Sequence, residues 1–425
     1  MNTKIYNFTN YAIGILLFIF FICEHHVEFT AIKNISLYLA LFLSLVLLFT
    51  NKELTCKNIK NNFLLAKYPL IFLSIFIIYA FIIALFPYSK EFDTFKNTFS
   101  EFGRGIAFLF IILAYASNEY KKPKLFFYSV LFAYVLITLY YMEPLFKEFD
   151  KLSASTEDSR IINRAYSFYI DRFFIFGILG ILIFKNKYLE AFFIVFSVIA
   201  VVMAILTGAR GAWVCLVICS VLFLAFVFFT KYKNIIKKRY KTITFIILSS
   251  FVVIGYFAYN SSIFQYKISQ NNSSGRDIIL KERFPLLINS DRAFWGLGYE
   301  EHQYDQFLSD ELDKGHKISR MTIRDEKKHW LNDEPFFIGN YYYFGFIGTF
   351  VLFLSFLSLL IGCFNEFRYS RNLLYAGIFL SVFSYFGIRG IVETYNLKIL
   401  YLFYMIGFFI LVKRGLAANE NRYKQ

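Results

Sequence analysis

Long apolar runs, separated by shorter polar segments, follow one another along the chain. Most runs reach the roughly 17–25 residues that a helix needs to cross the hydrocarbon core of a bilayer. The run at 173–185 is the weakest, and its helix can begin nearer Ser167, across Asp171 and Arg172. The pattern predicts an all-α, polytopic integral membrane protein with about twelve transmembrane helices, at residues 8–23, 35–50, 69–86, 103–117, 125–142, 173–185, 188–206, 212–230, 242–260, 337–363, 373–388 and 396–412.

Two polar segments are much longer than the other connections, residues 143–172 and 261–336. A loop as long as the second is uncommon unless it has a function. Ser274-Gly275 before Arg276 indicates a helix start, and Pro285 then kinks or ends that helix. We therefore expect three parts: helices one to nine over 1–260, a partly helical outer cap over 261–336, and helices ten to twelve with a tail over 337–425.

The composition supports this class of protein. Hydrophobic residues make up 58% of the chain and charged residues 18%, whereas soluble domains have about 45–50% and 25%. The 57 Phe and 32 Tyr against 21 Gly and 6 Pro favour long apolar helices. The runs lack the apolar–polar alternation of an outer-membrane barrel. The five cysteines show no spacing typical of a metal site or a disulfide framework.

The net charge of +15 is unevenly placed. With both termini in the cytoplasm, the inner loops become strongly basic and the outer segments nearly neutral, as the positive-inside rule requires. Six basic residues lie between Lys231 and Lys241 alone. The charge therefore indicates a multi-pass topology with the cap on the outer side rather than a surface for nucleic acid.

Two arginines stand where anions could bind. Arg210 lies between Gly208 and Gly211 in a short outer turn, and its guanidinium offers a fork of donors suited to phosphate. It could equally extend to lipid headgroups. Arg276, at a predicted helix N-terminus, could bind an anion or stay a solvated loop residue.

Three further residues lie at predicted membrane edges. His329 and Glu334 precede the tenth span, and either could be a general base or simply a surface group. Arg389 lies in the sequence Gly387-Ile388-Arg389-Gly390, which could also be an ordinary interfacial turn. The chain contains neither a P-loop nor an H-E-x-x-H motif. We expect no metal site and no cofactor.

Four motifs in order resemble the O-antigen ligase family, within the wider O-antigen ligase and polymerase superfamily. Gly208-Ala209-Arg210-Gly211-Ala212-Trp213 is similar to the family's S-R-G-A-W, with Ala209 in place of Ser. Gly296-Leu297-Gly298-Tyr299 is similar to its G-Y-G element and Gly345-Phe346-Ile347-Gly348 to its G-x-x-G. Ile388-Arg389-Gly390 resembles its V-R-G. The resemblance covers most of the chain.

This resemblance implies a metal-independent, inverting glycosyltransferase of the bacterial inner membrane, acting in lipopolysaccharide biosynthesis. The donor would be an O-antigen glycan on undecaprenyl diphosphate, and the acceptor a sugar hydroxyl of lipid A–core. Arg210, Arg276 and Arg389 would bind the diphosphate. Members usually carry a histidine about eleven residues before the G-x-x-G, where this chain has Glu334, with His329 five residues earlier. The base would be His329, favoured because a neutral imidazole needs no pKa adjustment, or Glu334.

Two other functions remain open. An O-antigen polymerase of the same superfamily shares the many spans, the long outer loop and an arginine in each of two outer loops. A lipid-linked glycan transporter also suits twelve spans, but should carry ionisable groups deep within its helices. Here Asp171 and Arg172 are the main candidates, near the end of a span.

Overall fold

The computed structural model describes residues 3–24, 29–115, 121–154, 160–184, 186–234, 240–269, 276–324, 327–330, 334–392 and 398–423. Within them the chain is largely helical, and its sheet consists of a single pair of short strands. The elements are α1 (Thr3–Cys23), α2 (Thr30–Thr50), α3 (Lys52–Leu65), α4 (Lys67–Leu85), α5 (Thr94–Ala114), α6 (Lys121–Lys147), η1 (Phe149–Ser153), α7 (Ala165–Ile183), α8 (Lys187–Leu206), α9 (Arg210–Phe228), α11 (Tyr240–Asn260), α12 (Ser262–Ser269), α13 (Arg276–Ile288), α14 (Glu301–Asp313), β1 (Met321–Arg324), β2 (Lys327–Trp330), α15 (Phe336–Ser370), α16 (Leu373–Val382), η2 (Phe383–Arg389), α17 (Gly390–Val392) and α18 (Leu400–Tyr423).

The expectation of an all-α chain with many long apolar helices is confirmed. Among the described residues, nine helices are long and apolar enough to cross a membrane. Two of the other expected spans fall on shorter apolar helices, at Leu248–Asn260 and Leu373–Arg389, and the last falls on α18. Helix α7 starts at Ala165 and carries Asp171 and Arg172 inside it, as the alternative start predicted.

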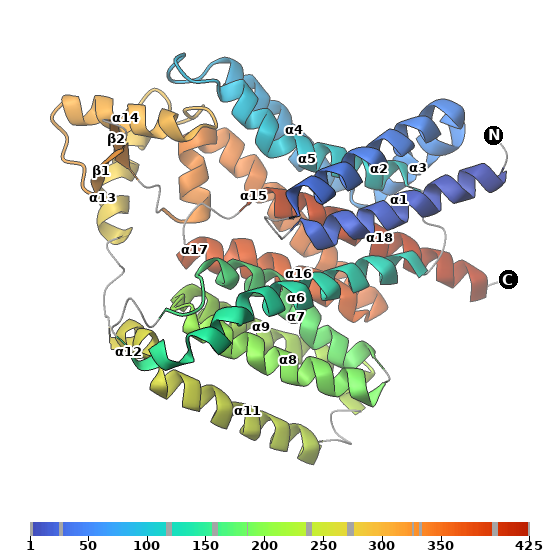
Figure 1. Cartoon of the computed structure of the whole chain (residues 1–425). Helices are drawn as coiled ribbons and strands as arrows, with labels where there is room; N and C mark the ends of the chain where they lie inside the picture. Colours follow the sequence, from blue (N-terminus) through green and yellow to red (C-terminus); the bar gives the residue numbers. More distant parts are fainter. Residues whose placement is uncertain are drawn as a thin grey trace.

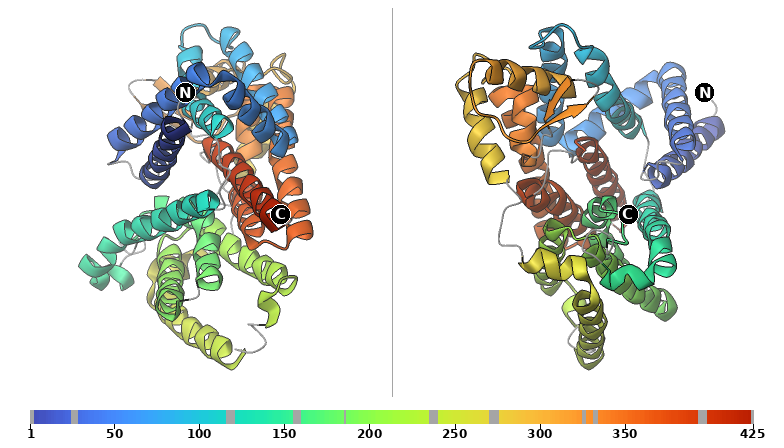
Figure 2. Two further views of the ribbon diagram at one scale, coloured as in Figure 1. Left: turned by 90° about the vertical axis from the view of Figure 1, so that its right-hand side faces the viewer. Right: turned by 60° about the vertical axis from the view of Figure 1, so that its left-hand side comes forward.

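Both chain termini lie at one end of the bundle, and α13, α14, β1 and β2 lie at the other (Figure 1). Helices α1 to α5 and α15 form one group, and α6 to α9 with α11 form a second group (Figures 1 and 2). Helix α18 packs against α5 and α3 of the first group and α6 of the second, and α16 packs against α7, α9 and α15. The two termini thus lie at the opposite end of the bundle from α13, α14 and the β-hairpin, a group that we call the cap.

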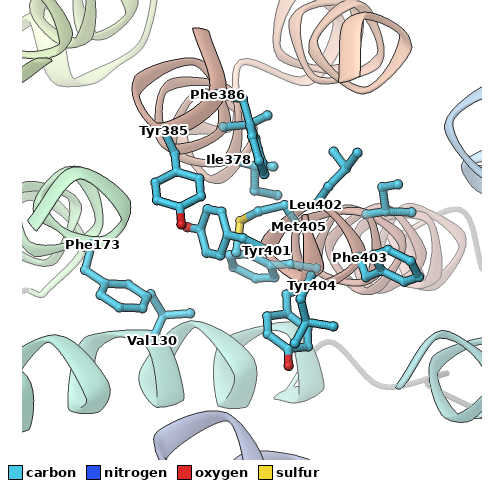
Figure 3. Close-up of a cluster of buried hydrophobic side chains, with 14 of the residues drawn as sticks. Val130, Phe173, Ile378, Tyr385, Phe386, Tyr401, Leu402, Phe403, Tyr404 and Met405 are labelled. Atoms are coloured by element: carbon cyan, nitrogen blue, oxygen red, sulfur yellow. The ribbon is translucent and has the colours of Figure 1, made fainter. Parts of the chain in front are cut away.

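The core is centred on α18. Every residue from Ile399 to Val412 is buried, and the Phe108 ring of α5 packs against the backbone at Gly407. A helix that is apolar on all sides lies in a protein core or in a bilayer, and the contacts of α18 with α3, α5, α6 and α16 place it in the core. Figure 3 shows Tyr401 and Tyr404 of this helix among side chains from η2, α7 and α6. The central position of α18 explains why the last span joins the two helix groups.

Between α11 and α15, the described residues form three helices, α12 to α14, and a β-hairpin. Helix α13 starts at Arg276, as predicted, but Pro285 neither ends it nor prevents it from reaching Ile288. The antiparallel pairing of β1 with β2, which sets Thr322 opposite His329, was not predicted. Strands of four residues are too short to give a clear alternation, so only the pairing itself defines them.

Two of the glycine motifs join this segment to the bundle. Gly345 has φ +61° and kinks α15, and Gly296 has φ +87°. A Cβ on Gly345 would lie 2.4 Å from the Phe294 carbonyl oxygen, and one on Gly296 would lie 2.4 Å from the Gly345 nitrogen. The Leu297 and Gly298 N–H groups donate to carbonyls of Tyr342 and Tyr343. Only glycine permits this approach of two backbones.

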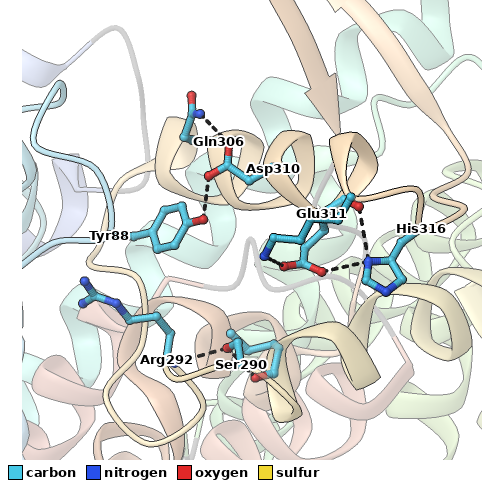
Figure 4. Close-up of polar contacts among 9 residues, drawn as sticks. Tyr88, Ser290, Arg292, Gln306, Asp310, Glu311 and His316 are labelled. Atoms are coloured by element: carbon cyan, nitrogen blue, oxygen red, sulfur yellow. Dashed lines mark hydrogen bonds and ion pairs between the residues drawn. The ribbon is translucent and has the colours of Figure 1, made fainter.

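Helix α14 is held by a second set of contacts. The Tyr88 hydroxyl, in the connection between α4 and α5, donates to Asp310 Oδ2 at 2.6 Å, as Figure 4 shows. Gln303 is fully buried, and its amide accepts from the Ser89 N–H and donates to the Ser89 carbonyl. These bonds fix one face of α14 on the bundle and leave its neighbouring face for β2.

Candidate functional site

A buried carboxylate–imidazole pair lies where α14 meets β2. His329 Nδ1 is 2.7 Å from Asp305 Oδ2, and both side chains are buried. The Trp330 N–H donates to Asp305 Oδ1 at 2.8 Å. The strand that carries His329 therefore also positions the carboxylate that holds its ring.

The hydrogen bond to Asp305 determines which nitrogen of His329 could accept a proton. An ionised carboxylate only accepts hydrogen bonds, so Nδ1 carries the proton in the neutral ring and Nε2 presents its lone pair. Among the described residues, Nε2 has no hydrogen-bond partner, although Glu301 Oε1 lies 3.5 Å away. Glu301 is exposed, whereas Nε2 of His329 is itself buried within the protein. An imidazole that a carboxylate orients, and whose other nitrogen makes no hydrogen bond within the described part of the chain, has the arrangement of a general base.

Glu334 lies in a different cluster. It is 1% exposed, and its Oε1 accepts from the Tyr304 hydroxyl at 2.8 Å. That hydroxyl accepts from Arg283 Nη1 at 2.9 Å. Burial, followed by the nearby Glu334 charge, holds the pKa of Tyr304 well above its usual range, so the hydroxyl remains a donor. Arg283, Tyr304 and Glu334 thus form a compensated buried chain.

Arg210 is the first residue of α9 and is half-buried. Gly208 turns the chain with φ +67°, and a Cβ there would lie 2.7 Å from the side chain of Ile263. The Trp213 ring lies 4.7 Å from the Phe264 ring. Helix α12 therefore covers this turn.

The structure does not gather all the expected residues in one place. Helices α12 and α14 lie apart in Figure 1 and in the right-hand view of Figure 2, which separates the turn of Arg210 from the pair at His329. Arg276 is the first residue of α13, but its side chain and residues 270–275 lie outside the described part of the chain. His329 and Glu334 both flank α14, through Asp305 and Tyr304.

Arg389 lies inside the bundle rather than in an exposed turn. It ends the π-helical segment η2, is fully buried, and its Nη1 is 3.0 Å from Asp171 Oδ2. Its Nη2 donates to the Ser167 hydroxyl at 2.7 Å. In this arrangement its guanidinium is engaged by α7, which differs from the expected binding of a diphosphate.

Arg172, next to Asp171, has aromatic partners. Its Nη2 donates to the Tyr385 hydroxyl at 2.7 Å, and its guanidinium carbon lies 4.4 Å and 5.2 Å from the ring centroids of Tyr385 and Tyr401. Such cation–π contacts stabilise a desolvated guanidinium. Two arginines and one aspartate are therefore buried where α7 meets η2 and α18.

A cavity of about 840 Å³ opens between α2 and α5. Its polar lining includes Lys33, Lys96 and Arg104, and its apolar lining includes Tyr38 and Phe110. Glu24 lies within 3.5 and 3.6 Å of Lys33 and Arg104. Glu24 therefore balances two of the three basic side chains that line this cavity.

Within the described residues, no group of three or more His, Cys, Asp or Glu side chains is arranged to hold a metal ion. The chain matches no protein-family model, and a search of curated proteins gives no significant match. The likeness to O-antigen ligases consequently rests on the four motifs.

Asp305 and Arg283 were missed from the sequence. Asp305 follows Tyr304 and precedes Phe307 and Leu308 on the buried side of α14. An acid on the apolar stripe of an amphipathic helix is the signal that could have identified it. Its partner could not have been identified in this way, because His329 reaches it through a hairpin that has no clear sequence signal.

Proposed function

We propose that this protein is a glycosyltransferase of the O-antigen ligase type, which moves a glycan from undecaprenyl diphosphate to a hydroxyl of lipid A–core. The observation that carries the proposal is the Asp305–His329 pair, in which the Nε2 edge of the imidazole has no hydrogen-bond partner among the described residues. The pair lies in a cap that packs on one end of an apolar helical bundle. Substrates anchored in a membrane would meet a base there.

The proposed step is a direct displacement. The acceptor hydroxyl loses its proton to His329 Nε2 while its oxygen attacks the anomeric carbon. The new glycosidic bond forms as the bond to the diphosphate oxygen breaks, and undecaprenyl diphosphate leaves with the electron pair. Asp305 stabilises the imidazolium that forms. Cationic side chains stabilise the leaving charge, with Arg210 and Arg276 as the proposed donors.

Arg389 has a positioning role in this proposal, because Asp171 already engages its guanidinium at 3.0 Å.

The buried chain of Arg283, Tyr304 and Glu334 makes Glu334 the weaker candidate for the base. Its Oε1 already accepts from Tyr304, whereas the ring of His329 is oriented by the Asp305 carboxylate.

The experiment is complementation of a strain that lacks this protein, followed by the lipopolysaccharide gel pattern. We expect His329→Ala to lose the whole ladder and Glu334→Gln to keep it. His316→Ala is the matched control, because His316 is exposed and pairs with Glu311 at the other end of α14. Retention of a single repeat on the core in the deletion strain would indicate a polymerase. A full ladder from His329→Ala at equal protein level would remove the histidine from the mechanism.

Transport of a lipid-linked glycan is the second candidate, and one observation favours it. Asp171, Arg172 and Arg389 are buried among helices that are apolar enough to span a membrane, and ionisable groups in such positions often line transport pathways. Purified protein in detergent separates the two functions. Joining of glycan to lipid A–core without vesicles indicates the transferase, whereas a transporter gives no product there.

A further inference from the structure

A small groove between α9 and α15 lies far along both helices from the cap. Its volume is about 380 Å³, and its lining combines aromatic rings with two arginines, Arg368 and Arg371. Both helices approach their C-termini here. Lys413, in the last part of α18, pairs with Glu366 of α15 at 2.6 Å. The groove therefore lies at the end of the bundle that carries the chain termini.

The apolar wall of the groove is built from phenylalanines. Phe226 of α9 packs edge-on against Phe367 of α15, with ring centroids 4.7 Å apart. Phe229 and Phe364 also line the groove, and both are exposed. Exposed aromatic rings gain free energy when apolar atoms cover them, so such a wall suits a hydrocarbon chain better than a polar ligand.

The two arginines of the groove face no acidic side chain within the described part of the protein. Both are exposed, and among the described residues no carboxylate lies within ion-pair distance of either guanidinium. The neighbouring acid, Glu366, is engaged by Lys413. The mouth of the groove therefore presents two positive charges beside an apolar wall.

The backbone of Arg371 gives an independent reason to expect a role for its side chain. It ends α15 with φ +53°, in the left-handed region that glycine normally occupies at this place. A non-glycine residue there is unfavourable unless the surroundings hold it. In this conformation the guanidinium carbon lies 5.9 Å from the Phe229 ring centroid, at the groove. The guanidinium thus reaches the groove from a backbone conformation that favours glycine.

We propose that this groove binds an anionic glycerophospholipid of the leaflet that faces the chain termini, with its phosphate on Arg368 and Arg371 and an acyl chain along the phenylalanine wall. The charge complementarity selects an anionic headgroup, and basic pockets between helices on the cytoplasmic side bind such lipids. The site is separate from the Asp305–His329 pair and does not depend on the proposed glycosyl transfer.

The test is native mass spectrometry of the purified full chain, titrated with phosphatidylglycerol or with phosphatidylcholine of the same acyl chains. We expect the wild type to retain phosphatidylglycerol preferentially. Removal of one charge should weaken retention about fivefold, and Arg368→Ala with Arg371→Ala about 25-fold. The matched control is Lys57→Ala with Lys60→Ala, which removes two exposed charges from α3 and should leave retention unchanged.

Two further variants separate binding from folding. Arg371→Gly should raise or preserve thermal stability, because it relieves the left-handed residue, and should still weaken lipid retention. Ala225→Trp should fill the groove and reduce retention with both arginines present, because Ala225 lines it. Normal retention by Ala225→Trp, equal retention of the two lipids, equal loss in the lysine control, or displacement of the lipid by soluble glycerol 3-phosphate would each overturn the proposal.

Discussion

Asp305→Asn tests the candidate base through its tautomer. The amide oxygen of the substituted side chain can still accept from the Trp330 N–H, which in the wild type donates to Asp305 Oδ1 at 2.8 Å. The amide NH₂ then faces His329 Nδ1, in the place of an oxygen 2.7 Å away. Since this NH₂ group only donates, Nδ1 must accept, and the ring proton moves to Nε2. Nε2, the proposed basic nitrogen, therefore loses its available lone pair.

The expected fall in rate equals the contribution of general base catalysis, which the substitution removes. General base catalysis contributes about 10²- to 10⁴-fold, so the rate of glycan transfer should fall by that factor, equivalent to about 3–5 kcal/mol of activation free energy. The substitution conserves volume and both hydrogen bonds, so thermal stability should change little. A loss of rate without a loss of stability distinguishes a positioning residue from a purely structural one.

The assay is transfer from a lipid-diphosphate donor to lipid A–core by purified protein in detergent. Asp310→Asn is the matched control, because Asp310 lies on the same helix and bonds Tyr88 and Gln306 instead of His329. We expect the control to transfer at nearly the wild-type rate. Wild-type transfer by Asp305→Asn would refute the reasoning, as would equal losses in both variants.

Three other predictions concern packing and topology. Arg389→Ala should lower the free energy of unfolding by about 3–5 kcal/mol, because it removes the ion-pair partner of the buried Asp171 carboxylate. Thermal melts measure this loss, and the double variant with Asp171→Asn should recover part of the stability. Gly345→Ala should weaken the packing of the cap on the bundle, because the added Cβ would overlap the Phe294 carbonyl. We expect faster proteolysis within residues 276–330 while the helical bundle stays folded. In a cysteine-free background, Ser309→Cys should react with an impermeant maleimide in intact spheroplasts and Asn234→Cys only after lysis. The reverse labelling would invert the orientation.

Much of the fold could be predicted because a membrane imposes few choices. Every backbone polar group in hydrocarbon must bond within its own helix, so apolar runs and helices coincide, as they do in α4 and α8. The early start of α7 was also predictable, since Asp171 and Arg172 interrupt hydropathy but not helix periodicity. The hairpin of β1 and β2 was not predictable, because its four-residue strands depend on pairing with each other.

The sequence by itself determined the helical class, the long outer segment and the residues with a capacity for chemistry, among them His329 and Arg389. Tertiary structure alone decided their partners. Asp305 meets His329 through a hairpin, and Asp171 meets Arg389 from a distant part of the chain, so neither pairing has a local signal. Hydropathy is a property of each segment, whereas the ionic environment of a side chain depends on which segments pack together. For this reason the sequence could suggest Arg389 as a diphosphate ligand, and only the packing of α7 against η2 placed it in a buried ion pair.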